Sequence, residues 1–152
     1  MILRKALAAL IVLAMLFGSA AAEWIICRPD SYVNVRRSPN KRATEIGRVE
    51  LGDEVTLTGK MKNGYAECTG LAFEEDTGWI HAGYIVEDEP EIIGEIYRHC
   101  GNGRTALRKW VNGPRRAWAT EETTFRVYAM TDEWALTSKG FIRAEFIEPD
   151  GQ

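Results

Sequence analysis

The feature that most constrains the fold of this chain is an internal repeat between its two halves. Residues 78–85 read GWIHAGYI and residues 140–147 read GFIRAEFI, so both follow the pattern Gly-aromatic-Ile-x-Ala-x-aromatic-Ile. Three further pairs of blocks match upstream in the same order: 63–66 with 132–135, 55–57 with 125–127, and 33–37 with 105–109. Because a repeated block order is the signature of a duplicated unit, the chain is expected to hold two copies of one unit of about 60 residues.

Each copy is predicted to be a small β-structure. Residues 32–36 and 54–58 alternate apolar and polar side chains, which suits strands with one buried face. Asn63-Gly64 lies between two such runs, and Asn-Gly is a strong hairpin signal. Several short strands separated by turn residues predict a small all-β barrel or sandwich.

The core of each copy is expected to rest on aromatic side chains, because a unit this short has little else to bury. Burying one large side chain stabilises a fold by roughly 1.5–3 kcal/mol. The expected core residues are Ile46, Tyr65, Trp79 and Tyr84 in the first copy, and Trp118, Trp134, Phe141 and Phe146 in the second.

The first 22 residues have the features of a cleavable signal peptide. Arg4 and Lys5 precede an apolar run, which ends in small residues at Ala20-Ala21-Ala22. The alternative is a retained membrane anchor, but the apolar stretch is shorter than the roughly 20 residues that a spanning helix needs. We therefore expect a secreted, extracellular or cell-envelope protein with no stable membrane span after cleavage.

The net charge is mildly negative, with 22 acidic and 19 basic residues. This balance argues against a nucleic-acid partner, which normally selects a basic surplus. Basic residues nevertheless cluster after the opening strand of each copy, with Trp110 and Trp118 interleaved in the second cluster. These basic clusters form either the rim of a groove that binds carboxylates, or solvated loops, in which case Trp118 lies in the core. The clusters are Arg36, Arg37, Lys41 and Arg42, then Arg104, Arg108, Lys109, Arg115 and Arg116.

The repeat blocks of the first copy resemble the bacterial SH3 family. That family has an LNVRSGPS opening, a VIGxLxxGxxV middle, an NGWxxV strand and a GWVxxxYL ending. The chain reads VNVRRSPN at 33–40, EIGRVELGDEV at 45–55, NGYA at 63–66 and GWIHAGYI at 78–85. The resemblance spans about residues 24–88. The second copy keeps the ending and the arginine of the opening but reads LRKWVNGP at 107–114, so it is divergent.

The resemblance implies an all-β chain of two tandem small SH3-like β-barrels after a cleavable signal peptide. The expected divisions are 1–22 for the signal peptide, 23–88 for the first domain, 89–94 for a linker and 95–150 for the second domain. Residues 87–91 read EDEPE, which is typical of a linker or an exposed loop.

The resemblance also implies a binding module without catalytic machinery. Exported modules of this family commonly accompany cell-wall hydrolases and bind peptidoglycan or its peptides. The expected ligand is therefore cell-wall peptide or glycan, or another extracellular ligand. The alternative is an interaction subunit that docks on a secreted enzyme through an open sheet edge. The expected ligand-binding residues are Tyr32, Arg36, Tyr65, Trp79, Arg108 and Trp110.

Three cysteines, Cys27, Cys68 and Cys100, would meet an oxidising environment after export. A Cys27–Cys68 disulfide is favoured because both residues belong to the first small barrel. A bridge from either of them to Cys100, or three reduced thiols packed as small apolar side chains, are the alternatives.

Catalytic, metal and cofactor chemistry are not expected. A cysteine nucleophile needs a histidine base and a third, orienting group. His81 lies where the second copy has Arg143, which indicates an exposed strand position, and the neighbours His99 and Cys100 should point to opposite faces of a strand. The sequence has no C-x-x-C pair of the kind that a zinc site typically uses.

Overall fold

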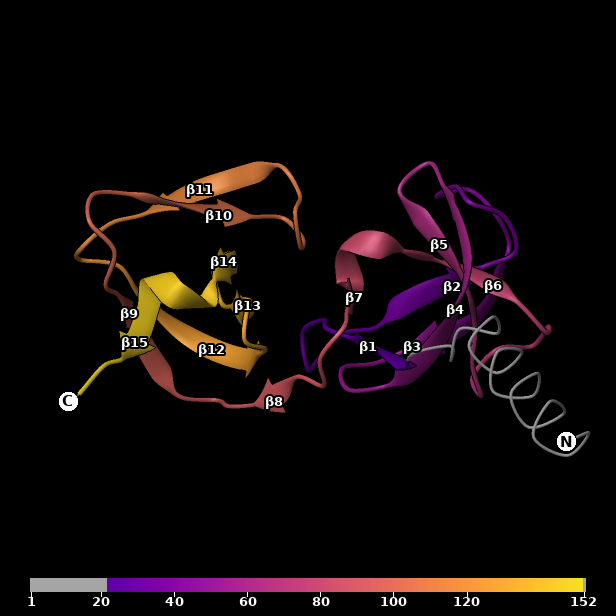
Figure 1. The fold of residues 1–152 in the computed structure, drawn as a ribbon, viewed down its shortest axis with the longest axis horizontal. Helices are drawn as coiled ribbons and strands as arrows, with labels where there is room; N and C mark the ends of the chain where they lie inside the picture. The colour runs from indigo at the N-terminus through magenta and orange to yellow at the C-terminus, as the bar shows by residue number, and fades with distance from the viewer. Residues whose placement is uncertain (1–21, 152) are drawn as a thin grey trace, which may run out of the picture.

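The computed structural model describes residues 22–151, which form an all-β chain with two short 3₁₀ helices. Each half of the chain makes one antiparallel sheet, and the two halves lie side by side (Figure 1). The predicted signal peptide, 1–22, lies outside the described residues except for Ala22, which begins the first strand. Among residues 22–151, no helix has the length and apolar character to cross a membrane.

The first sheet has seven strands in the order β3-β2-β6-β5-β4-β1-β7. Asn63 and Gly64 join β4 to β5 with φ values of 54° and 78°, so both residues of this turn are left-handed, as a two-residue hairpin requires. The strands are β1 (Ala22–Ile25), β2 (Val33–Arg36), β3 (Glu45–Val49), β4 (Glu54–Lys62), β5 (Tyr65–Thr69), β6 (Gly78–His81) and β7 (Ile85–Val86), with the 3₁₀ helix η1 (Ala82–Tyr84) before β7.

The second sheet repeats this order with its own strands, as β11-β10-β14-β13-β12-β9-β15, and β8 pairs with β12 beside that path. Neither path closes into a complete ring, but the predicted all-β fold class is confirmed, with two sheets of the same strand order. The strands are β8 (Glu91–Ile92), β9 (Ile96–His99), β10 (Thr105–Arg108), β11 (Arg115–Ala119), β12 (Thr124–Met130), β13 (Trp134–Thr137), β14 (Gly140–Arg143) and β15 (Ile147–Pro149), with η2 (Ala144–Phe146) before β15.

The arginine that ends the opening strand has the same structural task in both halves. A register shift precedes Arg36 in β2 and Arg108 in β10. Arg36 Nη1 donates to the Ala43 carbonyl at 3.0 Å, and Arg108 Nη1 donates to the Gly113 carbonyl at 2.8 Å. Each guanidinium therefore ties down the loop that follows its own strand.

The two cores are more aliphatic than the sequence predicts. Ile46 is fully buried among Ile25, Val35 and other aliphatic residues of the first sheet. Trp79 and Tyr65 are only half-buried and belong to no core cluster, and Trp118 is 37% exposed, so the prediction that they form the cores is wrong.

Strand alternation explains this error. Gly78 and Ile80 of β6 turn inward and are buried, so Trp79 between them must face outward. Tyr65 likewise stands on the outer face of β5, whose burial alternates along the strand. Tyr84 and Phe146 pack against the edges of the two cores, as partly buried side chains.

A third apolar cluster joins the two halves. Ile26 and Val86 of the first half pack in it with Trp134, Leu136 and Phe141 of the second. Trp134 and Phe141 are thus buried as predicted, but between the domains rather than inside the second one.

The outer face of β13 is therefore covered by the first domain. All four positions of β13 are buried, whereas the equivalent strand β5 alternates between buried and half-buried positions.

The predicted linker, 89–94, is partly joined to the second sheet. Ile92 of β8 pairs with Ala129 of β12, and the amide of Gly94 donates to the Val127 carbonyl at 2.7 Å. Residues 87–89 are exposed, so the freely solvated part of the connection is short.

Candidate functional site

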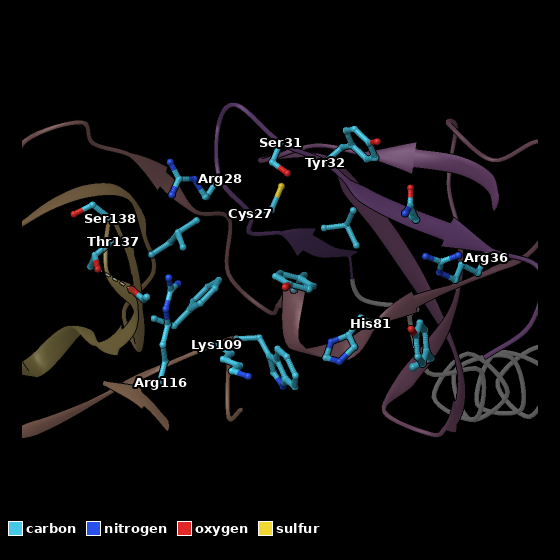
Figure 2. Close-up of a pocket in the computed structure, with 18 residues that line it drawn as sticks. Cys27, Arg28, Ser31, Tyr32, Arg36, His81, Lys109, Arg116, Thr137 and Ser138 are labelled. Atoms are coloured by element: carbon cyan, nitrogen blue, oxygen red, sulfur yellow. Dashed lines mark hydrogen bonds between the residues drawn. The ribbon is translucent and has the colours of Figure 1, made fainter. Parts of the chain in front are cut away.

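A cleft of about 420 Å³ opens between the two domains. Figure 2 shows side chains from both halves around it. From the first domain it is lined by Cys27, Arg28, Ser31, Tyr32, Val33, Asn34, Arg36, Tyr65, His81 and Tyr84, and from the second by Lys109, Trp110, Arg116, Leu136, Thr137, Ser138, Gly140 and Phe141.

Strand β2 builds one wall of the cleft. Val33 and Val35 turn into the core and are buried, so Asn34 and Arg36 stand together on the opposite face. Asn34 Oδ1 is buried and has no hydrogen-bond partner among residues 22–151. A buried acceptor without a partner is costly, so this wall favours a ligand, or a solvent molecule, that donates a hydrogen bond.

Four aromatic rings gather where the domains meet. The His81 ring lies 4.6 Å from the Trp110 ring of the second domain, and 5.5 Å from each of the Tyr65 and Tyr84 rings, between centroids. Edge and tilted arrangements of this kind are favourable ring contacts. The amide of Val111 also donates to the Gly83 carbonyl at 3.0 Å, which adds a backbone hydrogen bond between the domains.

His81 caps the short helix η1 at this meeting point. Its Nδ1 accepts a hydrogen bond from the Gly83 amide at 3.1 Å, so the neutral ring carries its proton on Nε2. Burial lowers the pKa of His81 from its ordinary value. The sequence indicates an exposed strand position here, which is wrong, because the ring is half-buried among three aromatic side chains.

The cleft is positively charged in an acidic protein. None of the described residues that line it is acidic, whereas four are basic. Arg28 is paired with Asp30, at 3.2 Å, and Arg36 is tied to its loop. Lys109 and Arg116 make no side-chain hydrogen bond or ion pair within residues 22–151, so their charges are available.

All three cysteines are free, and the predicted Cys27–Cys68 bridge is absent from the described chain. Cys68 lies on β5, and β4 separates β5 from β1, which precedes Cys27. Strands with one strand between them are about 10 Å apart, beyond the roughly 7 Å that a disulfide spans between Cα atoms. Both thiols instead pack in the first apolar core, while Cys100 is exposed.

The thiol in the cleft is poorly suited to nucleophilic attack. Burial raises the pKa of Cys27 to about 11 and that of Cys68 to about 12, so both stay protonated near neutral pH. His81 Nδ1 is already used by the Gly83 amide, and no carboxylate of the described chain lines the cleft to orient a base. The arrangement is suited to holding a ligand.

The other histidine is remote from any such chemistry. His99 is buried, with Nε2 2.7 Å from the Thr105 hydroxyl, while its neighbour Cys100 is exposed. Within residues 22–151, no group of three His, Cys, Asp or Glu side chains could hold a metal ion.

The cleft gathers four of the six residues expected to bind the ligand. Tyr32, Arg36, Tyr65 and Trp110 line it, whereas Trp79 and Arg108 are not among the lining residues. The lining also includes Asn34, His81 and Tyr84, which no sequence pattern marked as binding residues. The period of two along β2 could have placed Asn34 beside Arg36, but the arrival of Trp110 from the other domain carries no local signal.

The basic loop of the second domain divides between two surfaces. Arg104 and Arg115 stack on the exposed Trp118 ring, at 4.2 and 4.5 Å from its centroid, and none of the three lines the cleft. Arg116, the next residue along β11, lines the cleft instead, at the point where the register between β10 and β11 shifts.

One comparison with known proteins gives a family match within the first domain. Residues 31–86 match the family described as bacterial SH3 domain. A solved structure of NlpC1 from Trichomonas vaginalis is similar at 12% identity and a TM-score of 0.38, over 87% of this chain and 46% of that one. The chain thus spans less than half of that protein. No curated protein sequence matches the chain.

Proposed function

We propose that this chain, whose residues 31–86 form a bacterial SH3 domain, is an exported binding protein that recognises cell-wall peptide or glycan and catalyses no reaction. The bacterial SH3 family is one of non-catalytic binding domains, which supports the general class. The proposal extends this to the second half of the chain, which has the same strand order.

The observation that carries the proposal is the composition of the cleft between the domains. Aromatic rings offer flat apolar surfaces, and four basic side chains with no acidic neighbour in the lining offer charge. Concave sites with a few convergent polar groups on an apolar wall are the usual form of ligand sites. A raised thiol pKa at Cys27 points away from covalent chemistry in the same cleft.

A sedimentation assay tests the wall-binding part of the proposal. The full chain is mixed with purified peptidoglycan sacculi, and the bound fraction is measured against a cellulose control. We expect retention on sacculi that falls strongly for Tyr65→Ala, while Trp118→Ala, an aromatic truncation outside the cleft, binds normally. Equal recovery from cellulose and sacculi, or no recovery from either, would overturn the proposal.

Export is tested separately, on the product made in a bacterial host. We expect the protein in the periplasm or culture medium with its N-terminus at Glu23, as shown by mass spectrometry. An intact Met1 in a membrane fraction would contradict this part of the proposal.

A second candidate is an interaction subunit that docks on a secreted enzyme. The observation in its favour is that neither sheet path closes, with β11 as an edge strand of the second sheet; the edge of β3 in the first is bridged at Gly47 by Phe73. Co-purification of one stoichiometric protein from culture supernatant, without retention on sacculi, would favour this candidate over wall binding.

A further inference from the structure

We propose that the two domains together form a single site, and that its ligand is a short peptide with a free carboxylate. This inference rests on the proposed binding function and specifies the ligand and where it binds. It requires groups from both domains: Asn34 and the aromatic wall from the first, and Lys109 and Arg116 from the second.

The carboxylate is assigned to the second domain. Arg116 lies on β11 and Lys109 just beyond the end of β10, and Figure 2 shows both side chains on the same side of the cleft. Neither side chain is paired within the described chain, in contrast to Arg28, which is held by Asp30. A guanidinium fork matches a carboxylate in geometry and charge, and a second available cation in the same lining adds to the attraction for an anion.

The amide character of the ligand is assigned to the first domain. Asn34 Oδ1 is a buried acceptor without a partner among residues 22–151, and it belongs to the same cleft. A peptide presents amide N–H donors close to its carboxylates, so one short ligand can satisfy Asn34 and neutralise Arg116. The rings of Tyr65 and Trp110 then cover its apolar part.

The second domain is suited to this shared role because it has no open face of its own at the equivalent place. Trp134 of β13 corresponds to Tyr65 of β5. Each is the first residue of its strand and pairs with the last residue of the following strand, β14 or β6. Tyr65 faces the cleft, whereas Trp134 is buried against the first domain. The pair of domains therefore has one composite site rather than two equivalent ones.

Titration calorimetry on the full chain tests the inference with two peptides of the same length. One is acetyl-Ala-Glu-Ala-Ala with both carboxylates free, and the other is acetyl-Ala-Gln-Ala-Ala amide, which has none. We expect the acidic peptide to bind at least about tenfold more tightly, the lower end for hydrogen bonds to charged groups. Its affinity should fall as salt is raised.

Matched variants locate the site. Arg116→Gln should weaken the acidic peptide about tenfold, while Arg115→Gln, one residue away but stacked on Trp118 and absent from the cleft lining, should leave its affinity unchanged. Asn34→Ala should weaken both peptides about threefold or more, because a neutral hydrogen bond is lost. It should not lower the melting temperature, since Asn34 Oδ1 has no partner to lose within residues 22–151.

Several results would overturn the inference. Equal losses for Arg116→Gln and Arg115→Gln would indicate general charge attraction, and equal affinity for the two peptides would exclude a carboxylate site. Tighter binding of N-acetylmuramic acid than of the acidic peptide would assign the carboxylate to a sugar. If sacculi retain the chain but neither peptide binds, the peptide site is wrong while wall binding stands; if sacculi do not retain it either, both proposals fail.

Discussion

The contact between Gly83 and Trp110 offers a sharp test of how the domains hold together. A Cβ built on Gly83 would lie 2.3, 2.5 and 2.7 Å from Cδ1, Cγ and Cβ of Trp110. These separations are well inside carbon–carbon contact distance, so Gly83→Ala must push the indole out of its place. Overpacking of this kind costs about 1–3 kcal/mol, and we expect the free energy of unfolding to fall by that amount.

The backbone is not the reason for glycine at this position. Gly83 corresponds to Glu145 in η2, and the residues that flank the two helices have similar angles: φ −57° and ψ 119° at His81, against −62° and 130° at Arg143. A side chain is therefore acceptable in this turn when nothing packs on it. In a Trp110→Gly background, which removes the indole and also the Cβ at 2.7 Å, Gly83→Ala should be neutral or stabilising by about 0.4–1 kcal/mol.

The assay is a double-mutant cycle measured by urea unfolding, followed by tryptophan fluorescence and far-UV circular dichroism. A coupling energy of about 1 kcal/mol or more between Gly83→Ala and Trp110→Gly would support the packing argument. If Gly83→Ala is equally destabilising with and without the indole, the glycine serves the turn itself, and the argument is refuted.

Three further predictions concern titration, thiol chemistry and packing. Because burial lowers the pKa of His81 from 6.5, the unfolded chain takes up its proton first, so the free energy of unfolding should fall as the pH drops below about 6.5. This step should be missing in urea titrations of His81→Asn, which keeps an acceptor for Gly83; an unchanged step would contradict the assignment. At pH 8 a thiol reagent should label only Cys100 in the native protein, because Cys27 and Cys68 are buried and their pKa values are raised. Cys27 and Cys68 should react only in denaturant, and fast labelling of all three thiols in the native protein would contradict this. In urea unfolding, Phe125→Ala should lower the free energy of unfolding by about 3–5 kcal/mol, because the Phe125 side chain is only 2% exposed. Trp118→Ala should lower it by less than about 1 kcal/mol, and equal losses for the two variants would place the Trp118 indole in the core.

The aromatic residues of the repeat show what a local sequence pattern cannot predict. Trp79 and Phe141 occupy the same place in the repeat, yet Trp79 is half-buried and Phe141 is 3% exposed. Strand alternation turns both side chains to the outer face of their sheets. Only the second of those faces is covered, so the difference lies in the partner and not in the repeat.

The sequence by itself determined the elements and their repetition. Alternating side chains define the strands, Asn63-Gly64 defines a left-handed hairpin turn, and the repeated blocks correspond to two sheets of the same strand order. These features depend on neighbours a few residues apart, so they can be read locally.

Only the tertiary structure decided which faces pack, which remain open and which cysteines can meet. Trp110 reaches His81 across the domain boundary, and β4 keeps the strand of Cys68 apart from the one before Cys27. Such contacts join residues far apart in the chain, and they follow from burying the outer face of one sheet against another domain. No spacing within either half encodes them, so the cleft and its charge emerge only when both halves are in place.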